Sequence, residues 1–267
     1  MNQFKEKFNI LCAVVRSCGI ESRNIQSDIK RSYKSDGTVL TKADLYVSST
    51  ITEAIKTLFP KANIVNEELE VPFYQNAELT FILDPIDGTD AYSQGLPSWA
   101  ISLGLLDKDR EPIGAIIYAP RFGQGENDLF IKSIKNDKTT INDREVKLEN
   151  ITPPVKMIAM EASSLKILDF SQYKGNIRIF GSAILHMLSP IIFPYFQASV
   201  HNSCYVWDVA GPHAVLKNLG LDIEYIDGTP FIYNDDLLIN HKKYLMPIVS
   251  GNDSCRKELK TILSFKN

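Results

Sequence analysis

The sequence predicts an α/β fold. In the second half of the chain, short apolar runs that suit strands alternate with longer segments that suit helices. The first half opens with apolar residues at helical spacing and continues with runs rich in Ile, Val, Leu and Phe between turns. A chain of 267 residues, 44% hydrophobic and 23% charged, also has the composition of a globular protein with a large core.

The first half predicts two helices followed by strands. Residues 4–19 carry apolar side chains at helical spacing, so we expect an amphipathic helix there. The polar stretch 20–41 predicts a loop or a loose hairpin. A second helix is expected over 44–59, because its apolar residues share one face and a proline follows its end. Strands are predicted at 63–65, 79–83, 100–106 and 113–118, with shorter ones at 128–131 and 145–148 around a polar surface loop.

The second half begins after Pro153-Pro154 and alternates strands with helices. The expected strands are 155–160, 176–179 and 198–201, and the expected helices begin at Ser182 and cover 208–219. The double proline predicts a boundary between an N-terminal half, 1–153, and a C-terminal half, 154–267. A single compact domain with two sheets would give the same pattern.

Charge and apolar patterning exclude several classes of protein. The 29 basic and 32 acidic residues give a net charge of -3 with no basic cluster, so nucleic acid is not an expected partner. The best apolar stretch, 188–196, contains two prolines and is too short to cross a membrane. The N-terminus does not resemble a signal peptide, which predicts a cytoplasmic protein. The four cysteines and four histidines lack metal-binding spacing, so we expect neither disulfides nor a zinc site.

The most informative segment is an apolar strand that ends in two carboxylates. Asp84 and Asp87 follow the strand and precede Gly88 and Thr89. Carboxylates at the end of a strand lie where α/β proteins place their sites, and two of them can share a hard divalent cation. The backbone amides of Gly88 and Thr89 would then suit a phosphate group. A turn with a capping aspartate gives a similar pattern, so this segment alone leaves both interpretations open.

Two further acidic segments strengthen the metal hypothesis. Glu67 and Glu68 follow the apolar strand at 63–65, where an acidic pair can also be a solvated strand end. Asp208 stands after Trp207 at the expected start of a helix, where it can also be an N-cap. Neither segment is decisive by itself.

Taken together, the three segments resemble the inositol monophosphatase superfamily of magnesium-dependent, lithium-sensitive phosphatases. The matching motifs stand in the family's order: Glu67-Glu68, then Asp84-Pro85-Ile86-Asp87-Gly88-Thr89, then Trp207-Asp208-Val209-Ala210-Gly211. Shorter matches at 36–37, 41–44 and 181–183 support the resemblance, which covers about 34–220.

The resemblance implies a layered α/β/α/β/α sandwich of the inositol monophosphatase and fructose-1,6-bisphosphatase type, usually dimeric, with two or three Mg²⁺ ions per site. It implies that Glu67, Asp84 and the carbonyl of Ile86 hold the first metal. Asp84, Asp87 and Asp208 would hold the second metal, with Asp84 bridging the two. The N-terminal half would thus carry most ligands, and the C-terminal half the last one.

The resemblance also implies roles around the metals. Asp44 would lie near Thr89 and Glu67 and help to position the attacking water. Gly88 and Thr89 would contact the phosphate. The remaining residues implied on the substrate side are Gly181, Ser182 and Asp208.

The sequence departs from the family pattern at two positions. Asn66 stands where the family usually has Gly, and we expect it to tolerate a left-handed turn there. Asp90 follows Gly88-Thr89 and adds a carboxylate beside the expected phosphate site.

The implied activity is hydrolysis of a phosphate monoester by a metal-activated water. Because residues 90–105 resemble the inositol and histidinol phosphatase branches, the favoured substrate is a small polyol or sugar phosphate of the inositol 1-phosphate type. A 3'(2'),5'-bisphosphate nucleotidase and a histidinol-phosphatase are the enzymatic alternatives. A non-catalytic binding protein on the same fold is the alternative of another class.

Overall fold

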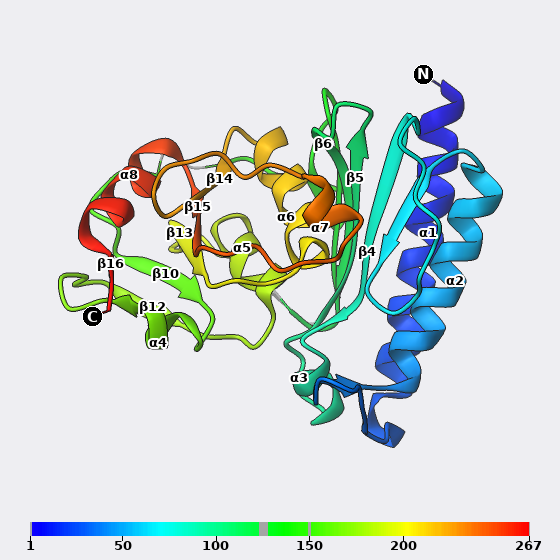
Figure 1. The fold of residues 1–267 in the computed structure, drawn as a ribbon, viewed down its shortest axis with the longest axis horizontal. Coiled ribbons are helices and arrows are strands. Elements are labelled where there is room, and N and C mark those ends of the chain that lie inside the picture. Colours follow the sequence, from blue (N-terminus) through cyan, green and yellow to red (C-terminus); the bar gives the residue numbers. More distant parts are fainter. Residues whose placement is uncertain (1, 123–127, 149–150, 267) are drawn as a thin grey trace.

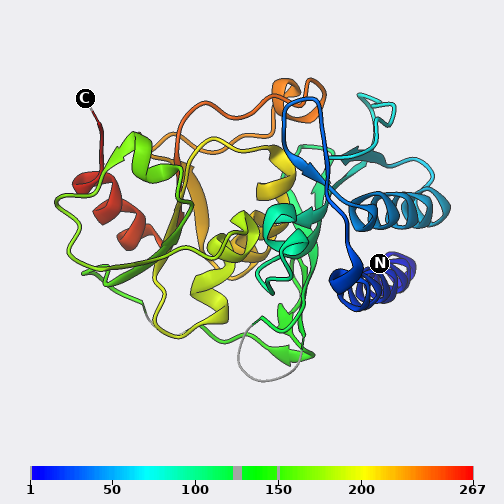
Figure 2. The same ribbon diagram turned by 90° about the horizontal axis from the view of Figure 1, so that it is seen from below.

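The computed structural model describes residues 2–122, 128–148 and 151–266. It has five layers of helices and sheets (Figure 1). Two helices, α1 (Asn2–Asn24) and α2 (Lys42–Leu58), cover the outer face of a seven-stranded sheet, as Figure 2 shows from below. Two more, α5 (Ala183–Ile192) and α6 (Val206–Asn218), lie between this sheet and a five-stranded sheet, and α8 (Asp253–Ile262) packs outside the second sheet. The expected α/β/α/β/α layering is confirmed.

The seven-stranded sheet comes from the first half of the chain. Its strands, in spatial order, are β3 (Asn63–Asn66), β4 (Leu79–Asp87), β5 (Ala100–Asp107), β6 (Pro112–Ala119), β7 (Leu129–Ile134), β8 (Thr140–Ile141) and β9 (Arg144–Glu145). β3 and β4 are parallel, and the other neighbours are antiparallel. The prediction missed β8, and the strand expected at 145–148 is wrong beyond Glu145, where the backbone leaves the sheet.

The five-stranded sheet comes from the second half. Its spatial order is β12 (Asn176–Arg178), β10 (Met157–Met160), β13 (Ala198–His201), β15 (Ile248–Gly251) and β14 (Asp222–Tyr225). β12, β10 and β13 run parallel, whereas β15 is antiparallel to both of its neighbours. The sequence predicted the three parallel strands and missed the other two. The two sheets thus divide near the predicted boundary, but the division into separate domains stays a prediction.

The first helix is longer than predicted because its glycine does not end it. A Cβ at Gly19 would lie 2.1 Å from the ring of Tyr118 on β6, so this glycine allows α1 to approach the sheet closely. The expected loop at 20–41 is therefore wrong for its first residues. The rest holds a 3₁₀ turn (Gln26–Asp28) and a small hairpin; its strands are β1 (Ser32–Tyr33) and β2 (Val39–Leu40).

Close contact between α6 and β5 determines where the start of α6 lies. A Cβ at Gly104 on β5 would lie 2.7 Å from the backbone nitrogen of Gly211, and one at Gly211 would lie 2.1 Å from Oγ of Ser102. Because neither position has a side chain, helix and sheet pack backbone to backbone. This contact brings the first turn of α6 next to β4.

The remaining elements are short. They are α3 (Thr89–Ser93), α4 (Ser164–Ile167), α7 (Asp235–Leu238), β11 (Leu168–Asp169) and β16 (Ser264–Phe265). Among the described helices, none is both long and apolar enough to span a bilayer.

Candidate active site

A β-bulge turns Asp84 and Asp87 toward the same side of the first sheet. Asp84 pairs with Ser102 and Asp87 with Ala100, so the register between β4 and β5 shifts over three residues of β4 and two of β5. In a regular strand, residues three apart face opposite sides of the sheet. The extra residue reverses that alternation, and Pro85 suits this position because a bulge does not need its missing N–H.

Asp208 completes a group of three carboxylates. One oxygen from each of Asp84, Asp87 and Asp208 lies within 4.8 Å of the others. The helix begins at Val206 rather than at Asp208, which therefore occupies the third helical position. Its Oδ2 accepts a hydrogen bond from the backbone nitrogen of Tyr205 at 2.8 Å. Asp208 is thus not the N-cap residue, but one of its oxygens still supports the helix start.

The three carboxylates destabilise one another's charged forms. Burial, followed by the charges of Glu67, Asp87 and Asp208, raises the pKa of Asp84 well above its ordinary value. Burial and the charge of Asp87 likewise raise the pKa of Asp208. Asp84 Oδ1 is buried and accepts no hydrogen bond from a described residue. A carboxylate oxygen left without a donor among other carboxylates fits a divalent cation, for which oxygen is the preferred ligand.

Asp87 is also held by the start of α5. The backbone nitrogens of Ala183 and Ile184 donate to Asp87 at 3.2 and 2.8 Å, and the hydroxyl of Ser182 donates to Asp87 Oδ2. These donors partly offset the effect of burial, which raises the pKa of Asp87 to about 6. Gly181 and Ser182 therefore lie beside the acidic group, and the Ser182 hydroxyl is already engaged with Asp87.

Glu67 lies at the open end of β3, against a lysine that the sequence patterns did not indicate. Lys34, in the turn of the β1–β2 hairpin, is 2.8 Å from Glu67 Oε1 and 2.5 Å from Glu68 Oε1. Burial raises the pKa of Glu67 to about 7, although Lys34 opposes that shift. The negative charge of Glu67 is the largest charge effect on the pKa of Asp84, although Glu67 is not in the group formed by Asp84, Asp87 and Asp208.

Asn66 contributes through its side chain rather than through an unusual backbone. It lies within β3 and is not among the described residues with positive φ, so the left-handed backbone that Asn66 was expected to tolerate does not occur there. Its Oδ1 accepts hydrogen bonds from Ser48 Oγ and from the Glu68 nitrogen, both at 2.9 Å, and its Nδ2 donates to Thr52 Oγ1 at 3.0 Å. Asn66 thereby fixes the acidic pair to α2. The available sequence signal was an Asn between an apolar strand and two acidic residues.

Asp44 in the first turn of α2 and Thr89 at the start of α3 contact each other through their side chains. The Thr89 hydroxyl lies 3.2 Å from Asp44 Oδ1 and 2.8 Å from the carbonyl oxygen of Ile86. Asp44 Oδ2 accepts from the nitrogen and hydroxyl of Thr41 at 2.8 and 2.5 Å, because α2 begins two residues earlier than expected. Burial raises the pKa of Asp44 to about 6.

Gly88 and Asp90 lie on either side of Thr89. Gly88 has φ of +83°, and a Cβ there would lie 2.9 Å from the carbonyl oxygens of Gly181 and Ser98. Gly88 therefore joins the two halves at close range. Asp90 is about two-thirds exposed, lies 3.4 Å from Arg31 and accepts from Gln94 at 2.7 Å, so its charge is partly offset.

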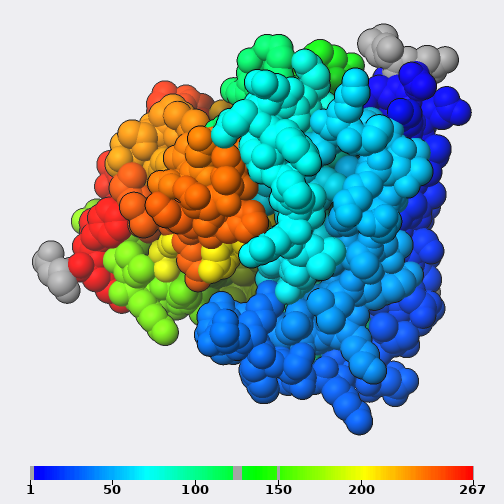
Figure 3. Space-filling model, turned by 45° about the vertical axis from the view of Figure 1, so that its right-hand side comes forward, coloured from blue at the N-terminus to red at the C-terminus, as the bar shows by residue number. Residues whose placement is uncertain are grey.

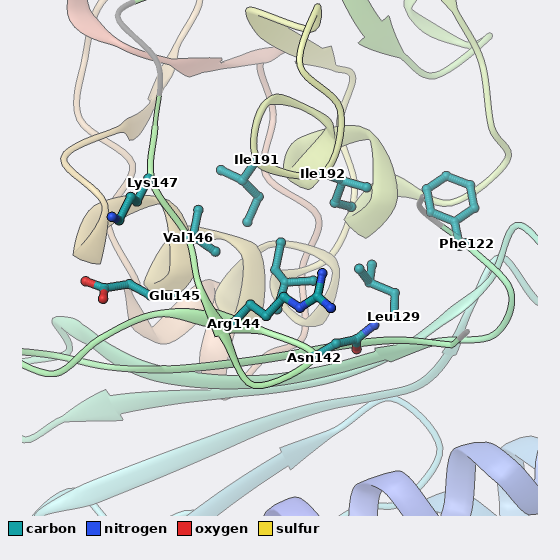
Figure 4. Close-up of a pocket in the computed structure, with 10 residues that line it drawn as sticks. Phe122, Leu129, Asn142, Arg144, Glu145, Val146, Lys147, Ile191 and Ile192 are labelled. Atoms are coloured by element: carbon teal, nitrogen blue, oxygen red, sulfur yellow. The ribbon is translucent and has the colours of Figure 1, made fainter. Parts of the chain in front are cut away.

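These residues lie where the two halves face each other. In Figure 3 the blue and cyan segments of the first half and the orange and yellow segments of the second half surround a hollow. A separate pocket of about 420 Å³ lies between β7–β9 and the end of α5, with Phe122, Arg144 and Ile192 among its lining residues (Figure 4). None of the candidate site residues lines this second pocket.

The chain was compared with protein families, with curated proteins and with solved structures. The model of the inositol monophosphatase family matches residues 7–251. The chain belongs to this family. It is therefore related to phosphatases, and the resemblance seen in its motifs is confirmed.

Relatives within the family carry different names. The chain is 26% identical over 254 residues to Inositol monophosphatase 1 of Saccharomyces cerevisiae, covering 86% of this chain and 82% of that protein. It is 23% identical over 252 residues to Nus factor SuhB of Pasteurella multocida, with 89% and 90% covered. It is 22% identical over 235 residues to the 3'(2'),5'-bisphosphate nucleotidase CysQ of Escherichia coli K12, with 84% and 92% covered.

Solved structures agree on the fold. The Thermotoga maritima IMPase has a TM-score of 0.79 at 18% identity, with 96% of each chain covered. An IMPase/NADP phosphatase complexed with Mg²⁺ and phosphate has a TM-score of 0.78 at 16% identity, covering 97% of this chain and 95% of that one.

Proposed function

We propose that this phosphatase is a magnesium-dependent phosphate monoester hydrolase that acts on a small polyol or sugar phosphate, most simply inositol 1-phosphate. The observation that carries the proposal is the group of Asp84, Asp87 and Asp208, with oxygens within 4.8 Å of one another and one buried oxygen without a donor. The relative complexed with Mg²⁺ and phosphate supports it.

The proposed metal ligands fall into two overlapping sets. Glu67, Asp84 and the carbonyl of Ile86 form one set, and Asp84, Asp87 and Asp208 form the other. When bound, two or three Mg²⁺ ions would supply positive charge for the phosphate and a water that loses its proton near neutral pH. The carboxylates provide oxygen ligands whose negative charges offset those of the ions.

Asp44 and Thr89 are proposed to orient the attacking water. The single proton of the Thr89 hydroxyl can be donated to the Ile86 carbonyl at 2.8 Å or to Asp44 Oδ1 at 3.2 Å. When it is donated to Asp44, the Thr89 oxygen can accept a hydrogen bond from water. Asp44 is fixed for this purpose by Thr41. Glu67 would complete the same side of the site.

The phosphate is proposed to lie between the two halves. The backbone amides of Gly88 and Thr89 would face it from one half, and Gly181, Ser182 and Asp208 would face it from the other. The separation of 2.9 Å between Gly181 O and a Cβ built on Gly88 supports this placement, because these segments are in contact.

The finer properties are proposed from the family. We expect inhibition by lithium, because a related staphylococcal inositol monophosphatase forms an inhibitory complex when soaked in 100 mM LiCl. We also expect a homodimer in the cytoplasm. A non-catalytic binding protein is disfavoured because all the acidic side chains and Thr89 are present.

A panel of phosphate esters tests the proposal. The panel contains inositol 1-phosphate, 3'-phosphoadenosine 5'-phosphate and histidinol phosphate. With Mg²⁺, we expect the highest kcat/KM for inositol 1-phosphate. Excess chelator should abolish turnover, and LiCl should reduce it. Preference for one of the other esters would favour that alternative, whereas full activity in chelator would refute the metal mechanism.

A further inference from the structure

Three parallel strands of the second sheet end at the candidate site. β12 is followed by Ser182, whose hydroxyl donates to Asp87, and β13 is followed by the loop that leads to Asp208 in the first turn of α6. The neighbouring strand β10 is parallel to both, so it ends at the same edge. Parallel strands place ligand-binding residues at this edge. The residue that follows β10 is Glu161, and the pairing of Met160 with Val200 places it opposite His201.

Glu161 is held from behind by a buried chain of polar groups. Its Oε1 lies 3.4 Å from His201 Nδ1, and its Oε2 accepts from Ser163 Oγ at 2.9 Å. His201 is fully buried, and its Nε2 lies 2.9 Å from Ser199 Oγ, which in turn lies 2.6 Å from Ser250 Oγ. These contacts restrict the carboxylate, while 22% of the Glu161 side chain remains exposed.

The charge of Glu161 acts on the site without belonging to the three-carboxylate group. It contributes to raising the pKa of both Asp87 and Asp208. Its carboxylate is not part of the group formed by Asp84, Asp87 and Asp208. A fixed acceptor beside the ligands, rather than among them, is suited to contact the part of the substrate that leaves.

We propose that Glu161, positioned by His201, is a specificity-determining residue that accepts hydrogen bonds from the hydroxyl groups of the leaving alcohol. This inference rests on the proposed phosphatase function and names the substrate class of the same site. A polyol supplies hydroxyl donors to the carboxylate. A substrate with a second phosphate brings like charge toward it, which disfavours a bisphosphate nucleotide.

The test compares kcat/KM for inositol 1-phosphate with kcat/KM for phenyl phosphate, whose leaving group lacks further hydroxyls. In Glu161→Gln the ratio should fall at least about tenfold, because a hydrogen bond to a charged acceptor becomes a neutral one. The matched control is Glu53→Gln, which makes the same change on the exposed face of α2 and should leave the ratio unchanged. An unchanged ratio in Glu161→Gln, or an equal loss on both esters, would overturn the inference.

Two further measurements separate specificity from folding. Glu161→Asp keeps the charge but shortens the side chain, so KM for inositol 1-phosphate should rise while the melting temperature stays near that of the wild type. For 3'-phosphoadenosine 5'-phosphate, Glu161→Gln should increase kcat/KM relative to inositol 1-phosphate, and a decrease would contradict the proposal. A wild-type enzyme that hydrolyses no polyol phosphate would refute the proposed function itself, and the inference with it; a wild-type enzyme that does so while the variant ratio is unchanged would refute only the inference.

Discussion

The hydroxyl of Thr89 makes two contacts, one within its own turn and one with Asp44 on α2. Its place directly after Gly88 suits the start of a short helix, and its hydroxyl reaches the Ile86 carbonyl at 2.8 Å, as in many turns. The same hydroxyl also lies 3.2 Å from the buried Asp44. Only the second contact crosses from one element to another, 45 residues apart.

We expect Thr89→Ala to lower kcat by about 100-fold or more, because general acid–base assistance is lost. The measurement is steady-state kinetics on inositol 1-phosphate together with the melting temperature. Thr89→Ser keeps the hydroxyl and should retain much of the activity. If the alanine variant loses stability but keeps its turnover per folded molecule, the hydroxyl serves only the turn.

For Asp208→Asn we expect separate effects on folding and on magnesium. The asparagine oxygen can still accept from the Tyr205 nitrogen, and removing the negative charge of Asp208 relieves its repulsion with Asp87. The metal-free melting temperature should therefore be at or above that of the wild type. A magnesium titration should show much weaker dependence and a large fall in kcat. Unchanged magnesium dependence would mean that the second metal takes its ligand elsewhere.

At the scale of elements, close approaches between backbones assemble the site. The bulge in β4 aligns two aspartates, the Gly104–Gly211 contact brings α6 to the sheet, and Gly88 lies against Gly181 and Ser98. The two glycine contacts depend on the absence of a side chain, because a Cβ at Gly88, Gly104 or Gly211 would lie too close to the neighbouring segment.

Two glycines in one segment test this effect. Gly88 and Gly95 have similar positive φ values, +83° and +80°, but a Cβ at Gly95 would meet nothing within 4 Å. Gly95→Ala should cost only the left-handed conformation, about 1–2 kcal/mol of unfolding free energy. Gly88→Ala should cost more and should also lower kcat, because Gly181 O and Ser98 O must move. Denaturant unfolding of both variants checks this, and equal losses would argue against the contact.

In the whole molecule, the group of three carboxylates contains side chains from both halves of the chain. Asp84 and Asp87 come from the first sheet, whereas Asp208 lies in the first turn of α6, a helix of the second half. A cation bound among them would connect the halves and remove the repulsion among buried carboxylates. Metal binding is therefore expected to stabilise the entire fold.

The pH dependence of this stabilisation has a defined sign. Burial raises the pKa of Asp44 and Asp87 in the folded protein to about 6 and that of Glu67 to about 7. In the unfolded chain these carboxyl groups have pKa values near 4. Their protonated forms therefore contribute fully to the free energy of unfolding below pH 4, and this contribution is lost as the pH rises through 6–7. Mg²⁺ competes with those protons. We expect saturating Mg²⁺ to raise the melting temperature by about 5 °C or more at pH 8 and by less at pH 5.5. Calorimetry with Mg²⁺ and with chelator at both pH values measures it; an equal gain at both would contradict metal–proton competition.

The family motifs and the elements with clear periodicity could be predicted from the amino-acid sequence. Asp84, Asp87 and Asp208 were predicted as neighbours, and α2, β5, β6 and β13 lie close to their expected ranges. These features are readable because a short segment contains its own pattern: apolar spacing defines a helix or strand, and a motif keeps residue types together.

The contacts between segments that are distant in the sequence could not be predicted from it. The pairing of Lys34 with Glu67, the anchoring of Asn66 to α2 and the position of Glu161 opposite His201 depend on contacts between different elements. The continuation of α1 past Gly19 likewise depends on the ring of Tyr118, which is 99 positions away in the chain. Spacing within one segment carries no information about such distant partners, because packing of helices and sheets, rather than local preference, brings them together.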